Sequence, residues 1–150
     1  MDNHTIEQRR HNMANIRSVS KPEETVRKYL FSQGFRYRKN DKRYAGTPDI
    51  VLPKYKTIVF INGCFWHQHP GCSKAAIPKS NTEYWLPKLQ KNVSRDRHNY
   101  AALENEGWNV LVIWECMLSK KNIDDTLNKL QEDIKKQKQA LMERGYNGHY

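Results

Sequence analysis

Three cysteines and a histidine have the types and spacing to bind a metal ion. Cys64, His69 and Cys72 form a C-x4-H-x2-C cluster, and Cys116 lies farther along the chain. Thiolate and imidazole groups bind Zn²⁺ tetrahedrally, and such a site can order a loop that buries little apolar surface. His67 is a competing ligand, and the cysteines could instead be three buried thiols beside a surface histidine. We favour the zinc site, because this irregular loop needs something to organise it.

Asp49 and residues near it could form the acidic part of a nuclease site. Pro48-Asp49 opens an apolar run and Glu23 stands on the preceding predicted helix, which resembles half of the Pro-Asp…(Asp/Glu)-x-Lys nuclease pattern. A carboxylate there can hold Mg²⁺, which neutralises a phosphodiester and activates water. The other half of the pattern is missing, because residues 61–63 contain neither an acid nor a lysine. Asp49 could therefore be an ordinary turn or cap residue.

The chain places Phe65, Trp66 and His67 directly beside the predicted zinc ligands. Aromatic side chains in a basic protein can stack on bases or wedge between them, which is worth about 1–3 kcal/mol per base. His67 could act as a general acid or base near neutral pH. The alternatives are that the two aromatics close the core and that the histidine has no role. Met13 and Ile16 likewise form either a second wedge or an ordinary docking stripe.

Composition and charge limit the classes of function. The chain has 150 residues, a net charge of +10 and 37% hydrophobic residues, enough for one core with a cationic surface. Residues 1–45 hold eleven Lys/Arg against five Asp/Glu, a net +6, so a polyanion such as DNA is the expected partner. No run approaches the roughly 18 apolar residues of a membrane helix, and no signal peptide is visible, so we expect a soluble cytoplasmic protein. An odd number of cysteines argues against a disulfide framework.

Hydrophobic periodicity and turn residues predict a single α/β domain over 20–150, preceded by a basic DNA-contacting arm over 1–19. The expected elements are, in order, a helix over 21–33, an exposed strand over 35–38, strands over 49–52 and 57–61, an irregular loop over 63–80, a helix pair divided at Pro87 and ending at Glu106, a buried strand over 108–114 and an amphipathic helix over 122–143. Strands 49–52 and 57–61 should form a hairpin, and capping boxes at 20–23 and 80–83 should start helices. The sequence thus predicts a mixed central sheet flanked by helices.

Taken together, five segments resemble the very short patch repair (Vsr) endonucleases: NMANI at 12–16, PD at 48–49, FINGCFWH at 60–67, NVSRD at 92–96 and WEC at 114–116. They occur in order between about residue 9 and about residue 135. The resemblance implies a restriction-endonuclease-like fold and a single-strand cut 5′ to the thymine of a T:G mismatch left when 5-methylcytosine deaminates. The partner would be double-stranded DNA, in functional linkage with a DNA cytosine-5 methyltransferase and a repair polymerase. The protein would act as a monomer on the bacterial nucleoid.

The resemblance also implies roles for individual residues. Asp49 would bind a catalytic Mg²⁺ together with the backbone carbonyl of Ile61, and Glu23 would support the waters of that site. His67 would be the general base or acid. Asn62 would stand at a catalytic position, but it departs from the best-known members, where a histidine stands there.

The remaining matched residues would bind DNA or a second metal. Phe65 and Trp66 would wedge into DNA beside the mismatch, and the arm would bring Met13, with Ile16 near it, from the other groove. The family's structural zinc ligands match four residues: Cys64, His69, Cys72 and Cys116. Two rival functions are a restriction-type nuclease on the same fold and a zinc-stabilised DNA-binding module without catalysis.

Overall fold

The computed structural model describes residues 21–145 of the chain. The elements are, in chain order, α2 (Pro22–Ser32), β1 (Ile50–Leu52), β2 (Thr57–Asn62), α3 (Thr82–Asn105), β3 (Asn109–Trp114) and α4 (Ile123–Glu143), with short 3₁₀ turns at Pro53–Tyr55, Ser73–Ala75 and Glu115–Leu118. The predicted N-terminal arm, with Met13 and Ile16, lies outside the described residues. Within residues 21–145, no helix is long and apolar enough to cross a membrane.

The strands form one mixed sheet in the order β1-β2-β3. β1 pairs antiparallel with β2, with Ile50 opposite Val59, so the predicted hairpin is confirmed. β2 pairs parallel with β3 up to Asn62 opposite Trp114. Parallel neighbours need a long crossover, and residues 63–108, which include α3, provide it.

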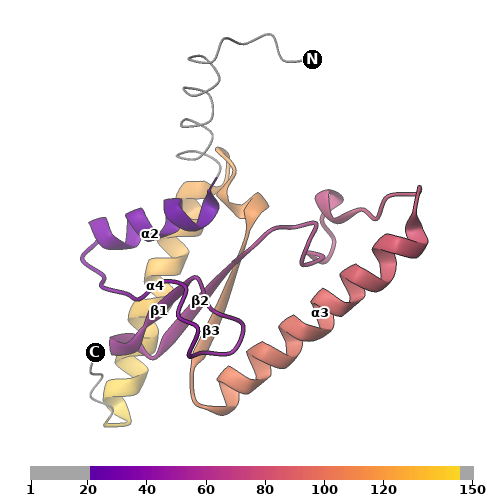
Figure 1. Ribbon diagram of the computed structural model, residues 1–150. Coiled ribbons are helices and arrows are strands. Elements are labelled where there is room, and N and C mark those ends of the chain that lie inside the picture. Colours follow the sequence, from indigo (N-terminus) through magenta and orange to yellow (C-terminus); the bar gives the residue numbers. More distant parts are fainter. Residues whose placement is uncertain (1–20, 146–150) are drawn as a thin grey trace, which may run out of the picture.

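Helices cover both faces of this sheet (Figure 1). On one face, side chains of α2 and α4 such as Leu30 and Ile134 join Val59 in a buried cluster. On the other face, Leu103 of α3 joins Ile58 in a second cluster. Because Ile58 and Val59 are neighbours and both fully buried, β2 is covered on its two sides.

Helices α2 and α4 match their predicted spans closely. α2 begins with Pro22 in its first turn, where the missing N–H of proline costs nothing, and it ends just before Gly34. α4 buries Leu127, Leu130 and Ile134 along one stripe, with Ile123 half-buried, so the predicted amphipathic helix is confirmed.

The strand predicted over 35–38 is wrong. Only Arg38 makes an isolated bridge, to Val51, and Phe35 is buried rather than exposed. The Phe35 ring packs on Tyr55 with a centroid distance of 5.2 Å. Packing against the core therefore decided the path of this segment, and the alternation of aromatic and basic residues did not.

Other differences concern how elements begin and how deeply they are buried. The N-cap residue of α3 is Asn81, which makes no capping hydrogen bond with its side chain, so the capping box predicted over 80–83 is absent. The N-cap residue of α2 is Lys21, which also makes no such bond, and Ser20 of the box predicted over 20–23 lies outside the described residues. α3 is one continuous helix through Pro87, where a break was predicted. A proline this close to the helix start removes one backbone hydrogen bond while tertiary packing holds the rest. β3 is mostly half-buried, since it lies at the edge of the sheet.

Candidate active site and metal-binding cluster

Asp49 lies in a bend directly before β1, beside the end of β2. Its Oδ2 accepts a hydrogen bond of 2.7 Å from the backbone N–H of Ile61. In an extended strand the N–H and C=O of one residue point to the same side, so the Ile61 carbonyl also faces the Asp49 side, past the end of β1. A carboxylate and a backbone carbonyl, both hard oxygen donors, therefore lie together at this edge.

The electrostatics at Asp49 favour a bound cation. Burial raises the pKa of this carboxyl, and the Glu23 carboxylate on α2 raises it further. The Ile61 N–H and the Arg27 guanidinium lower the pKa of Asp49 and so offset part of that rise. A buried acid with a second acid nearby gains from a divalent cation, and oxygen donors suit Mg²⁺. The residues at this position thus fit the magnesium site that the sequence predicts.

His67 and Asp96 form a hydrogen-bonded pair opposite this carboxylate. The distance from His67 Nδ1 to Asp96 Oδ2 is 2.6 Å, and both side chains are partly buried. Because Nδ1 is engaged by Asp96, Nε2 is the ring nitrogen left to exchange a proton. The two residues share one cavity of about 430 Å³ with Asp49 and Ile61. The cavity thus combines a metal-type carboxylate with a histidine held by an acid, a set suited to hydrolysis.

Asn62 takes part in this site through an orienting contact. It is 4% exposed, and its Nδ2 donates a hydrogen bond of 2.7 Å to the hydroxyl of Tyr100 on α3. Burial raises the pKa of Tyr100 to about 12, so this phenol stays protonated at neutral pH. An amide does not exchange protons in this pH range. Asn62 therefore ties β2 to α3 at the cavity and is not a proton carrier.

The four predicted zinc ligands also lie close together, and three of them belong to the loop that carries His67. The ligand atoms of Cys64, His69, Cys72 and Cys116 all lie within 4.8 Å of one another. His69 Nδ1 is 3.7 Å from Cys64 Sγ and 3.4 Å from Cys116 Sγ, and its ring stacks on Trp114 with a centroid distance of 4.3 Å. His67, the competing ligand in the sequence, contacts Asp96 instead. This cluster could hold a tetrahedrally coordinated ion.

Gln68 shapes the loop that separates the two histidines. It adopts a positive φ of 51°, and its side-chain amide donates to the carbonyls of Phe65 and Ala75 at 2.7 and 3.0 Å. The next residue, His69, donates its backbone N–H to the Cys64 carbonyl at 2.9 Å. These bonds turn the chain at Gln68, so that His67 and His69 point to different sites. His67 enters the cavity, and His69 enters the cysteine cluster.

The aromatic residues next to His67 form a partly exposed cluster that includes two members the sequence did not single out, Tyr84 and Trp85. Phe65 contacts Trp66 and Trp85 with ring-centroid distances of 5.1 and 5.4 Å, and Tyr84 contacts Trp85 at 5.0 Å. Trp66 is 47% exposed and Tyr84 is 57% exposed. The aromatics therefore do not simply close the core. The Asn92 side chain of α3 holds this cluster by donating to the Trp66 carbonyl at 3.0 Å.

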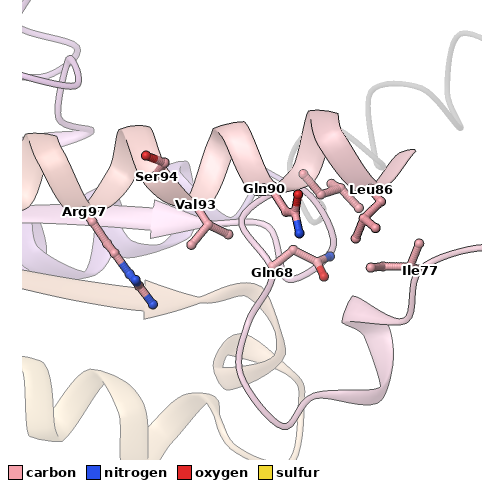
Figure 2. A pocket seen from close by; sticks show the side chains of 8 residues that line it. Gln68, Ile77, Leu86, Gln90, Val93, Ser94 and Arg97 are labelled. Carbon is pink, nitrogen blue, oxygen red and sulfur yellow. The ribbon is translucent and has the colours of Figure 1, made fainter. Parts of the chain in front are cut away.

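A second hollow lies along another face of α3 (Figure 2). It has a volume of about 420 Å³ and is lined by Gln68 and Ile77 of the loop and by α3 side chains including Leu86, Val93 and Arg97. None of its lining residues is a carboxylate, a histidine or a cysteine. The chemistry that hydrolysis needs is therefore concentrated in the cavity with Asp49 and His67.

Asp96, Trp85 and Arg27 are among the site residues that sequence reasoning missed. Asp96 belongs to a segment that carried the family resemblance, but its pairing with His67 depends on which face α3 turns to the sheet. Trp85 stands in a run of bulky residues at the start of α3, a signal for a further aromatic contact. Arg27 had no sequence signal, because a basic residue on a helix is normally exposed.

Comparisons with known proteins give one matching family model and several similar enzymes. A family model described as DNA mismatch endonuclease Vsr matches residues 1–74. The chain is 60% identical over 117 residues to the type II nicking enzyme V.NmeAIP of Neisseria meningitidis, covering 77% of this chain and 83% of the relative. It is 47% identical over 114 residues to the type II nicking enzyme V.XorIIP of Xanthomonas oryzae, covering 75% and 83%. It is 38% identical over 125 residues to the DNA mismatch endonuclease Vsr of Escherichia coli, covering 79% and 80%.

Proposed function

This chain belongs to the family of Vsr DNA mismatch endonucleases, and on that basis we propose that it is a Mg²⁺-dependent endonuclease that cuts one strand of double-stranded DNA 5′ to the thymine of a T:G mismatch. The observation that carries the proposal is the cavity in which Asp49 and the His67–Asp96 pair lie beside exposed aromatics. Mismatches of this kind arise when 5-methylcytosine deaminates. The nick would begin very short patch repair, in functional linkage with a cytosine-5 methyltransferase and a repair polymerase.

Two residues of this chain would hold the catalytic metal. Asp49 and the Ile61 carbonyl offer the oxygen donors, and Glu23 would orient waters around them. Mg²⁺, when bound, neutralises phosphate charge and stabilises the leaving oxygen. His67 would take a proton from the attacking water through Nε2, or return one to the leaving group. Asp96 would fix the tautomer of His67 and stabilise its protonated form.

DNA contact would come from the aromatic cluster and from the N-terminal arm. Phe65, Trp66 and Trp85 can stack on bases that open at the mismatch, which costs less at a wobble pair than in matched DNA. Met13 and Ile16, on the basic arm over 1–19, would approach from the other groove. The net charge of +10 would add sequence-independent attraction to the phosphates.

We further propose that the domain over 20–150 is a restriction-endonuclease-like fold that acts as a monomer. The antiparallel β1-β2 pair, the parallel β3 and the flanking helices support this assignment. The Cys/His cluster would hold a structural Zn²⁺ rather than a catalytic one, because four protein ligands leave no open position.

Strand-specific cleavage of labelled duplexes tests the proposed function directly. T:G, U:G and matched T:A pairs would be compared in several flanking sequences, with and without Mg²⁺. We expect a Mg²⁺-dependent cut just 5′ of the mismatched thymine and none in the opposite strand. Cleavage that ignores the mismatch would favour a restriction-type nuclease. Binding without cleavage in every context would favour a DNA-binding module.

Replacing Asp96 with asparagine is expected to slow nicking by about 10²–10⁴-fold, the range for loss of a positioned acid–base group. The asparagine would place an N–H against His67 Nδ1, which forces the proton onto Nε2 and removes the basic lone pair there. Single-turnover rates with saturating enzyme measure the effect on chemistry. DNA affinity should not change, and an unchanged nicking rate would contradict the assigned role of the pair.

Replacing Trp85 with alanine is expected to weaken binding to T:G duplex by about 5- to 150-fold, because one stacked base contributes about 1–3 kcal/mol. Binding to matched duplex should change much less, since matched bases stay stacked. Fluorescence anisotropy with both duplexes measures the ratio. Phe31→Ala is the control, because it removes an exposed aromatic side chain (56%) of α2 that has no ring contact with Phe65, Trp66 or Trp85. Equal losses on the two duplexes would argue against stacking at the mismatch.

A further inference from the structure

Arg27 of α2 is a buried cation that the proposed mechanism does not use. It is 4% exposed, with its guanidinium inside the protein between α2 and the residues before β1. Burying an arginine is costly unless its charge and its N–H groups find partners. The partners that it makes therefore indicate what this charge does in the fold.

Two of the guanidinium's hydrogen bonds go to a single backbone oxygen. Nε and Nη2 of Arg27 donate to the carbonyl of Asp49 at 3.2 and 3.0 Å. Nη2 also donates to Asn40 Oδ1 at 3.0 Å, and Nη1 donates to Glu24 Oε1 at 2.7 Å. Arg27 thus joins α2, the connection before β1 and the backbone of Asp49.

The backbone of Asp49 needs such an anchor, because it lies outside the sheet. β1 starts at Ile50, so no strand ladder fixes the Asp49 carbonyl. Arg27 holds the residue at that carbonyl, and the Ile61 N–H holds it at the carboxylate. With both ends held, the Asp49 carboxylate is positioned beside Ile61 of β2.

Glu24 makes this anchor compatible with a nearby metal ion. An uncompensated guanidinium next to Asp49 would repel a divalent cation. The ion pair of 2.7 Å with Glu24 offsets that charge, and it lowers the pKa of Glu24 so that the pair stays ionised. Arg27 can therefore position the carboxylate without adding a net positive charge beside it.

We infer that Arg27 is a positioning residue that sets the affinity of the Asp49 site for its divalent cation by anchoring the Asp49 backbone. The inference rests on the proposed function, in which Asp49 is a metal ligand. Residues that orient a metal ligand typically contribute about 10–100-fold to metal affinity or activity. Arg27→Gln removes the charge and one of the two bonds to the carbonyl, and Arg27→Lys keeps the charge but loses the planar fork.

A direct measurement of metal binding distinguishes a role of Arg27 in positioning Asp49 from a role in stabilising the fold. Mn²⁺ affinity of the zinc-loaded protein bound to an uncleavable T:G duplex would be measured by calorimetry, alongside the Mg²⁺ dependence of nicking. We expect about tenfold weaker Mn²⁺ binding in Arg27→Gln and a smaller loss in Arg27→Lys. Val26→Ala is the matched control, since it removes buried contacts from the same helix without touching Asp49. Its metal affinity should remain at the wild-type value.

The outcomes distinguish this inference from the function on which it rests. Mn²⁺ affinity within about twofold of wild type in the arginine variants, or an equal loss in Val26→Ala, would overturn the positioning role. If Arg27→Gln does not fold, the same criterion applied to Arg27→Lys decides. Asp49→Asn with undiminished Mn²⁺ binding would instead overturn the metal site itself, whatever the arginine variants do.

Discussion

Replacing Asp49 with asparagine is expected to abolish detectable nicking while the protein stays folded and binds DNA. A bound metal contributes several kcal/mol to hydrolysis, so its loss corresponds to about 10³-fold or more in rate. Asparagine keeps an oxygen that can accept the Ile61 N–H, which preserves the local backbone. It lacks the negative charge that attracts the cation. The change therefore tests the metal site and not the fold.

Stability and activity should change in opposite directions in this variant. Because burial raises the pKa of Asp49, the ionised carboxylate is less favourable in the folded chain than in the unfolded one. That penalty is present at neutral pH and disappears as the pH falls and the carboxyl is protonated. Without added Mg²⁺, Asp49→Asn should thus unfold at a higher denaturant concentration than wild type at pH 7, with a smaller difference in acid.

Nicking rates on T:G duplex and urea unfolding curves measure the two effects. Asp133→Asn is a suitable control, because Asp133 pairs with Lys129 on α4 and does not line the catalytic cavity. It should nick DNA at the wild-type rate. Nicking by Asp49→Asn within about tenfold of wild type, far short of what loss of a metal should cost, would show that another residue holds the metal.

The Cys/His cluster shows which ligands of a metal site can be predicted from the sequence and which cannot. The spacing of Cys64, His69 and Cys72 already indicated a local cluster, but Cys116 is 52 residues beyond Cys64. The parallel register of β2 and β3 supplies the missing link. Asn62 lies opposite Trp114, so Cys64 and Cys116 each follow that pair by two residues and leave the sheet together. A one-residue slip in pairing would have separated them.

The contacts around Asp49 were also beyond what the sequence pattern could predict. Periodicity predicted α2 and α4, because each buries one face that recurs along its own sequence, and two short apolar runs separated by turn residues predicted the β1-β2 hairpin. It could not predict that α2 turns Arg27 toward the Asp49 carbonyl, nor that α3 turns Asp96 toward His67. These contacts depend on how elements pack, and single-sequence patterns do not encode packing partners. The continuous path of α3 through Pro87 was likewise not predicted, because a proline in a sequence pattern indicates a break whether or not the helix continues.

Removing the Zn²⁺ that we propose for the Cys/His cluster is expected to lower the melting temperature by roughly 10–20 °C, if about 5 kcal/mol is lost. Structural zinc supplies about 10–16 kcal/mol of binding energy in small peptides, so this figure is conservative. Of residues 63–80 only Cys64 is buried, and the loop has little apolar packing to replace the ion. Burial also raises the pKa of Cys64 to about 11, so the thiolate form at neutral pH depends on a bound cation.

His69→Ala and His67→Ala form a matched pair for this test. The two histidines are separated by one residue, but His69 lies in the Cys/His cluster and His67 lines the cavity with Asp49. His69 lies 3.4 Å from Cys116 Sγ, so its loss should reduce zinc content well below one ion per chain and lower the melting temperature. His67 contacts Asp96, so its loss should slow nicking while zinc content and melting temperature stay near wild type. Metal analysis and thermal unfolding of both variants measure the difference. Wild-type protein that is folded, active and free of zinc would contradict the structural role, and zinc loss in His67→Ala would reverse the assignment of the two histidines.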